Sequence, residues 1–166
     1  PRTRLIELLE NGVQNPVTLI VAPAGYGKSV LASMWVQESE LPNAWFSLDR
    51  HDNDLHSFLS HLVKAIQKPF PEGLPQMTRL LRGAALPPIQ VLTRTFINEL
   101  DGLPQRFILV LDDYHTITAQ PVYDFITYLE IGDVAANGRY HTGTFTTKRS
   151  RIARVHAQRV KYIFEV

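Results

Sequence analysis

A glycine-containing loop that leads into Lys28 and Ser29 has the residue types and spacing that most clearly indicate chemistry. The segment 22–29 reads Ala-Pro-Ala-Gly-Tyr-Gly-Lys-Ser. Glycine tolerates the backbone conformations that let peptide N–H groups converge on phosphate oxygens. The Lys28 ammonium group would reach the β- and γ-phosphates of a nucleotide, and the Ser29 hydroxyl would ligate Mg²⁺. The segment therefore predicts a phosphate-binding loop.

Ala22 stands where such loops usually begin with glycine. Alanine fits this position if its φ angle stays negative. Taken alone, Gly-x-Gly-Lys-Ser could be no more than a turn that enters a helix, but the strand-like run before it and the helical pattern after it favour phosphate binding. We expect the bound nucleotide to be lined by Ala22, Pro23, Ala24, Gly25, Tyr26, Gly27, Lys28, Ser29 and Val30.

Two adjacent carboxylates, Asp112 and Asp113, follow the hydrophobic run 107–111. At the end of a strand, Asp112 could join the Mg²⁺ shell beside Ser29, and Asp113 could orient or deprotonate an attacking water. The alternative is an acidic turn after a core strand. We favour the first interpretation because the pair supplies carboxylates, which the loop lacks. We thus assign Lys28 and Asp113 to catalysis, and Ser29 and Asp112 to the metal.

The segments around these residues alternate between strand-like and helical patterns, which predicts an α/β fold. Aliphatic residues at 17–21 predict a buried central strand before the loop. The pattern at 159–166 is typical of a half-exposed edge strand. The other expected strands are 44–49 and 107–112, and the expected helices are 2–11, 30–36, 55–68, 76–86, 87–100 and 120–130.

Further polar residues follow the strand at 44–49. Asp49 and Asp52 lie past its carboxyl end, on the edge where open α/β sheets bind ligands. They could lie near Mg²⁺, but we favour a role in turns and caps. Asn53 or Asp54 can cap the helix that follows.

Basic residues near both ends of the chain have two interpretations each. Arg2 or Arg4 could touch the nucleotide, or could be solvated on a capping helix. A group without any acid lies near the other end. It could be a functional cluster that senses the γ-phosphate or binds nucleic acid, or a solvated or interface segment. Its members are Lys148, Arg149, Arg151, Arg154 and His156.

The composition is ordinary for a globular protein, with 45% hydrophobic and 20% charged residues and a formal net charge of +1. This balance does not indicate nucleic acid or membrane as the main partner. The absence of cysteine excludes disulfides and thiolate metal sites. No apolar run reaches the ~18 residues needed to span a bilayer, and we expect a cytoplasmic protein. Because Pro1 is not Met, we expect residues 1–166 to be one domain of a longer polypeptide.

Taken together, the motifs resemble the STAND class of P-loop ATPases, in particular the ATPase domain of large LuxR-type, maltose-regulon-activator-like bacterial transcriptional regulators. The resemblance covers roughly residues 1–130 and rests on segments 22–29, 44–49, 52–54 and 109–115. It implies a three-layer P-loop sandwich with a mostly parallel central sheet of about five strands and helices on both faces. It also implies a central strand at 141–147, after which Lys148 or Arg149 would contact the bound nucleotide as a sensor.

The resemblance implies a switch operated by ATP and ADP with Mg²⁺. ATP would favour an active form that self-associates, and slow hydrolysis would return the protein to rest. The expected partners are adenine nucleotide and other domains of the same polypeptide. Because the sequence contains no helix-turn-helix, no direct contact with DNA is expected. Two alternatives stay open: a structural module that binds nucleotide without hydrolysing it, and a phosphotransferase.

Overall fold

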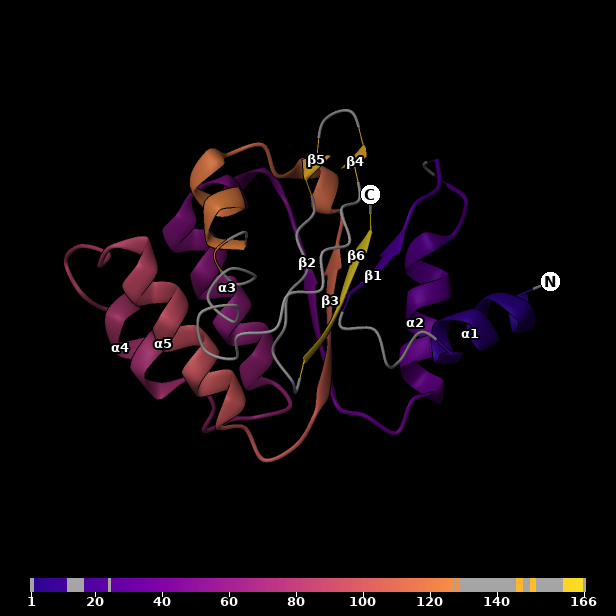
Figure 1. The fold of residues 1–166 in the computed structure, drawn as a ribbon, viewed down its shortest axis with the longest axis horizontal. Coiled ribbons are helices and arrows are strands. Elements are labelled where there is room, and N and C mark those ends of the chain that lie inside the picture. Colours follow the sequence, from indigo (N-terminus) through magenta and orange to yellow (C-terminus); the bar gives the residue numbers. More distant parts are fainter. Residues whose placement is uncertain are drawn as a thin grey trace.

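Four parallel strands form the centre of the molecule, in the order β1-β6-β3-β2 (Figure 1). They are β1 (Val17–Ile20), β2 (Asn43–Ser47), β3 (Phe107–Asp112) and β6 (Val160–Glu165). The computed structural model describes residues 2–11, 17–23, 25–126, 128, 146–147, 150–151 and 160–165. The expectation of an α/β fold with a parallel sheet is confirmed.

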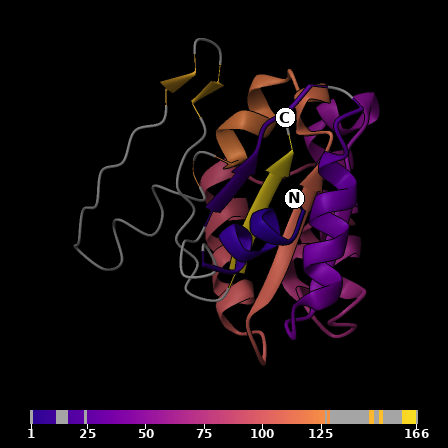
Figure 2. The same ribbon diagram turned by 90° about the vertical axis from the view of Figure 1, so that its right-hand side faces the viewer.

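Helices cover both faces of this sheet (Figure 1). On one side lie α1 (Arg2–Asn11) and α2 (Lys28–Glu38), which face the viewer in Figure 2. On the other side lie α3 (Leu55–Gln67), α4 (Pro75–Leu81), α5 (Ile89–Asp101) and a helical segment at 120–126. Two short 3₁₀ turns, η2 (Arg50–Asn53) and η3 (Tyr114–Thr116), follow β2 and β3.

Strand β3 separates two hydrophobic cores, because successive side chains of a strand point to opposite faces. Ile108 and Val110 pack with Trp35 of α2 on one face. Phe107 and Leu109 join the larger core on the other face. Every residue of β3 is buried, as a strand covered by helices on both faces requires. The strand that leads into the acidic pair is therefore covered by helices on both faces.

The prediction of an edge strand at 159–166 is wrong. Strand β6 lies between β1 and β3, so that Tyr162 is opposite both Val17 and Leu109. The alternation of apolar and polar residues along a strand indicates how exposed its two faces are. It does not indicate whether the backbone of the strand is paired on one side or on both, and this pairing decides its place in the sheet.

The prediction of a central strand at 141–147 is wrong for residues 146–147, and residues 141–145 lie outside the described part of the chain. Thr146–Thr147 form β4, which pairs antiparallel with β5 (Ser150–Arg151) in a separate two-stranded sheet. The apolar β6 takes the central position instead, which fits a buried parallel strand better than a threonine-rich segment does. Lys148 and Arg149 lie outside the described residues.

Other predicted elements are confirmed with shifts at their ends. The first strand ends at Ile20, and Val21 is 66% exposed rather than buried. In the described sheet, β1 lies at one end and not at the centre. Helix α4 ends at Leu81 and not at 86, because the Gly83 N–H turns back to the Leu80 carbonyl at 3.1 Å. No helix within the described residues is long and apolar enough to cross a bilayer.

Candidate functional site

The loop between β1 and α2 depends on two glycines with left-handed backbones. Gly25 has φ +81° and Gly27 has φ +76°, angles that other residues rarely adopt. The Tyr26 N–H donates to the Pro23 carbonyl at 3.3 Å, which closes a turn between them. Leu74 and Asp113 are the only non-glycine residues of the described part with a positive φ. Ala22 therefore keeps the ordinary φ that its place in the loop demands.

Lys28 is the first residue of α2, and its side chain turns back over the loop. Its ammonium group donates to the Ala22 carbonyl at 2.9 Å. An ammonium group has three donors, so this bond leaves two for a ligand. Gly27 precedes the helix without a side-chain cap. A helix that begins this way directs N–H groups and the positive end of its dipole toward the loop.

Ser29 and Asp112 meet although 83 residues separate them in the chain. The Ser29 hydroxyl donates to Asp112 Oδ1 at 3.2 Å. Asp112 ends β3 and is 8% exposed. A hydroxyl and a carboxylate are the hard oxygen ligands that Mg²⁺ prefers. The donor set fits this ion, and Ser29 and Asp112 are the residues that would hold it.

Asp113 differs from its neighbour in conformation and in exposure. It has φ +56° and ψ +34°, the left-handed region, at the start of η3. Its side chain is 57% exposed, and His115 Nδ1 lies 3.8 Å from its Oδ1. The carboxylate of Asp113 is thus available to solvent at the sheet edge where Asp112 is buried.

The acidic residues after β2 hold the turn η2. The Asp49 carboxylate accepts a hydrogen bond from the His51 N–H at 2.6 Å, and the Asp52 carboxylate accepts one from the Asp49 N–H at 2.8 Å. The bond from the His51 N–H lowers the pKa of Asp49. Asp54 caps α3, since the Ser57 N–H donates to it at 2.8 Å. The interpretation of these aspartates as turn and cap residues is confirmed.

Several residues predicted to contact the nucleotide cannot be placed at the loop from the described part of the structure. Ala24, Lys148 and Arg149 lie outside the described residues. Arg4 is exposed on α1, and no described contact links it to the loop. Tyr26 is 76% exposed and Val30 is 48% exposed, so both present apolar surface beside the loop.

Asn53 has a role that sequence reasoning missed. We expected Asn53 or Asp54 to cap α3, and Asp54 does so. Asn53 instead bonds to Thr116 and to Thr118, 63 and 65 residues further on. An Asn-Asp pair before a helix is a general cap signal. Nothing in its spacing indicates a partner so far along the chain.

Comparison with known proteins finds similarity to parts of much longer ones. The chain is 30% identical over 153 residues to "Serine/threonine-protein kinase PknK" of Mycobacterium tuberculosis, a match that covers 90% of this chain and 13% of that protein. It is 30% identical over 128 residues to "HTH-type transcriptional regulator MalT" of Vibrio parahaemolyticus, which covers 76% of this chain and 14% of the regulator. The MalT of Cronobacter sakazakii is 32% identical over the same length.

No protein-family model matches the chain. The chain spans only 13–14% of the length of these relatives. The similarity to the MalT proteins is consistent with the resemblance to LuxR-type ATPase regulators that the motifs indicate.

Proposed function

We propose that this chain is a P-loop ATPase domain that binds ATP and hydrolyses it slowly, as the switch of a signal-responsive transcriptional regulator. The observation that carries the proposal is the 3.2 Å contact between Ser29 and Asp112. It brings together the loop after β1 and the acidic end of β3. A phosphate loop and a strand-end aspartate at this distance are what a Mg²⁺-nucleotide site needs.

The sheet order supports the same proposal. Strand β6 lies between the strand that leads into the loop and the strand that carries the acidic pair. The resemblance to STAND ATPases implies an intervening strand at this place, although it is supplied by residues 160–165 and not by 141–147. We take the sheet to be the core of the three-layer P-loop sandwich.

Each site residue then has a distinct role. Lys28 neutralises the β- and γ-phosphates, and Ser29 and Asp112 hold Mg²⁺. When bound there, Mg²⁺ would supply positive charge that stabilises the phosphates. Asp113 orients the attacking water and accepts its proton. Its exposed carboxylate and its place next to Asp112 suit that task.

Two other functions use the same loop. A module that held nucleotide only as structure would have no use for an exposed carboxylate beside the buried Asp112. A phosphotransferase is suggested by the name of the mycobacterial relative. In protein kinases, however, the lysine lies on a strand separate from the glycine-rich loop. Here Lys28 directly follows the loop, which favours the P-loop proposal.

The proposed switch role is supported by the similarity to the MalT proteins, which are named as transcriptional regulators. The chain would act together with other domains of the same polypeptide, and the ATP-bound form would self-associate. We assign no DNA contact to these residues.

Isothermal titration calorimetry with Lys28→Ala tests the nucleotide site. Loss of a charged hydrogen bond should weaken ATP binding by about 2 kcal/mol, which is about 30-fold in Kd. The matched control is Lys64→Ala, which removes an exposed lysine from α3 and should leave binding unchanged. Equal ATP affinity in wild type and in a folded Lys28→Ala variant would reject the proposal.

A phosphate-release assay without an acceptor separates the alternatives. Slow release that depends on Mg²⁺ is expected for the switch. Binding without release would favour the structural module. ADP formation that requires an added acceptor, with the phosphoryl group found on the acceptor and not as free phosphate, would favour the phosphotransferase.

A further inference from the structure

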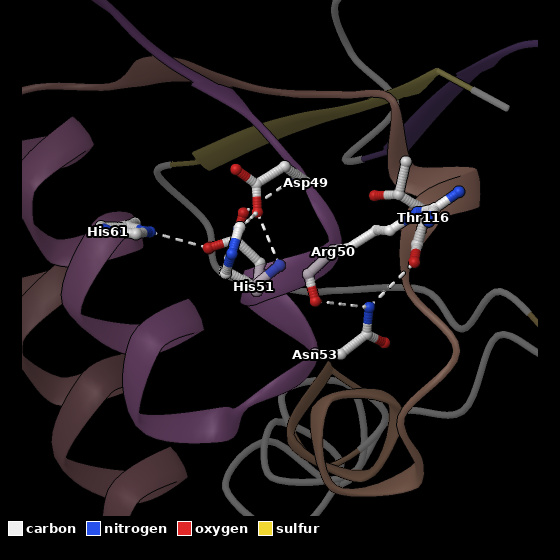
Figure 3. Close-up of polar contacts among 7 residues, drawn as sticks. Asp49, Arg50, His51, Asn53, His61 and Thr116 are labelled. Carbon is white, nitrogen blue, oxygen red and sulfur yellow. Dashed lines mark hydrogen bonds and ion pairs between the residues drawn. The ribbon is translucent and has the colours of Figure 1, made fainter.

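The Asn53 side chain joins the loop after β2 to the loop after β3 (Figure 3). Its Nδ2 donates to the carbonyl of Arg50 at 3.2 Å and to that of Thr116 at 3.0 Å. Its Oδ1 accepts from the backbone N–H of Thr118 at 2.6 Å and of Ala119 at 2.8 Å. One amide thus uses both its donor and its acceptor atoms on backbone groups of two loops.

This bonding pattern suits asparagine and no close substitute. An amide has two N–H donors and an acceptor oxygen on one short side chain. Aspartate would keep the acceptor but would place a negative charge against the carbonyls of Arg50 and Thr116. Alanine would remove every bond.

Helix capping does not account for Asn53. The N-terminus of α3 is capped by Asp54, which accepts from the Ser57 N–H at 2.8 Å. The turn η2 is held separately by Asp52, a buried residue whose carboxylate accepts from the Asp49 N–H at 2.8 Å and contacts His61 Nδ1 at 2.7 Å. Asn53 therefore extends from a turn that is already fixed to α3.

A short path of hydrogen bonds connects Asn53 to Asp113. The Thr116 carbonyl accepts from Asn53, and the Thr116 N–H donates to the Asp113 carbonyl at 2.9 Å. Asp113 itself has a left-handed backbone, which a non-glycine residue keeps only when its surroundings impose it. The Thr116 hydroxyl oxygen is buried and has no hydrogen-bond partner among the described residues. This segment is thus held in a conformation that does not satisfy all of its own polar groups.

We propose that Asn53 is a positioning residue for ATP hydrolysis, which keeps Asp113 in the left-handed conformation that points its carboxylate at the attacking water. The inference rests on the proposed function, because it needs Asp113 to act on that water. Asn53 does not touch the nucleotide in this proposal. It acts through Thr116 and the turn η3.

The test compares two variants of Asn53 with a matched control. Asn53→Ala removes the whole contact, and Asn53→Asp keeps only the acceptor. The control is Gln67→Ala at the far end of α3. Gln67 is also an amide that joins two segments, with Nε2 donating to the Gly73 carbonyl at 2.9 Å and to the Thr78 hydroxyl at 3.1 Å. Gln67→Ala therefore measures the general effect of losing such a bridge.

The wild type and each variant are then compared by hydrogen–deuterium exchange and by activity and ATP affinity. Hydrogen–deuterium exchange without nucleotide should be faster at residues 113–119 in Asn53→Ala and unchanged there in Gln67→Ala. In the phosphate-release assay, Asn53→Ala should lower kcat about tenfold or more, part of what a general base contributes. The Kd for ATP measured by calorimetry should stay within about twofold, since a positioning residue acts on the reaction and not on binding. Asn53→Asp should fall between Asn53→Ala and wild type.

The possible results separate this inference from the function on which it rests. Unchanged exchange at 113–119, or equal losses of kcat in Asn53→Ala and Gln67→Ala, would overturn the inference while the ATPase proposal stands. A parallel loss of ATP affinity and kcat would also overturn it, because Asn53 would then support the fold of the whole site. A wild-type chain that binds no ATP would overturn the proposed function, and the exchange data would still decide whether Asn53 holds Asp113.

Discussion

At the scale of single residues, the two adjacent carboxylates of the candidate site lie in different environments. Asp112 is buried and accepts the Ser29 hydroxyl at 3.2 Å. Asp113 turns away into a left-handed conformation, and its side chain is 57% exposed. The change of backbone conformation between them lets one peptide bond separate the proposed metal ligand, Asp112, from a carboxylate that faces solvent.

Substitution of each carboxylate should therefore have a different effect. We expect Asp113→Asn to leave Mg²⁺-dependent ATP binding nearly intact and to slow hydrolysis about 10²-fold or more, as loss of a general base does. Asp112→Asn should weaken binding and its Mg²⁺ dependence together. Calorimetry with and without Mg²⁺, combined with phosphate release, measures both. Similar modest losses in the two variants would contradict this division of roles.

At the scale of secondary-structure elements, a polar turn fixes the start of α3, the helix that follows β2. Helix α3 begins at Leu55 because Asp54 accepts from the Ser57 N–H. This bond lowers the pKa of Asp54, since it stabilises the charged carboxylate. The stabilisation is present above the pKa of the unfolded chain, about 3.9, and is lost as the pH falls through the lower pKa of the folded state.

The loss of stability on removal of this cap should likewise be larger at neutral pH than at acidic pH. Asp54→Ala should lower the free energy of unfolding by about 1 kcal/mol at pH 7. The difference from wild type should shrink as the pH falls below about 4, because the carboxylate of the unfolded chain becomes protonated there and that of the folded chain at a still lower pH. Urea unfolding at pH 7 and pH 3 measures it, with Asp101→Ala at the end of α5 as the control. A difference that is the same at both pH values would show that the charge of Asp54 contributes nothing.

Strand β6 has an inner position in the sheet. It is paired on both sides, with β1 and with β3. A chain that ends at residue 158 should lose cooperative unfolding, because β1 loses its neighbour and β3 loses one of its two. Removal of an edge strand would leave the rest of the sheet paired. Guanidinium unfolding followed by circular dichroism tests this, and a cooperative transition in the shortened chain would contradict the central position of β6.

At the scale of the whole molecule, parallel strands direct their carboxyl ends to one edge, where open α/β sheets bind ligands. The loop after β1, η2 after β2 and the acidic pair after β3 all gather there. Two helical layers close the faces of the sheet (Figures 1 and 2). The fold thus brings every described site residue to one edge and leaves the opposite edge to connections.

This arrangement leads us to expect weak catalysis by the chain alone. P-loop enzymes gain about 10³–10⁵ in rate from a cation at the γ-phosphate that another domain or subunit often provides. The isolated 166-residue monomer should bind adenine nucleotide but turn over more slowly than about one per second, well below typical enzymes. Steady-state phosphate release on monomer from size exclusion measures this. Faster turnover by the monomer would show a complete enzyme and would reject the switch.

The sequence alone determined the features that depend on neighbours along the chain. The loop 22–29, the helix after it, the acidic pair at the end of β3 and a helix cap at Asn53 or Asp54 all rest on local hydrogen bonds and side-chain periodicity. The central place of β6 depends on backbone pairing with β1 and β3, which lie far from it in sequence. The same holds for Asn53, whose bonds to Thr116 and Thr118 span more than 60 residues. Only the tertiary structure decides such contacts, because hydrogen bonds between distant segments leave no periodic signal in either segment.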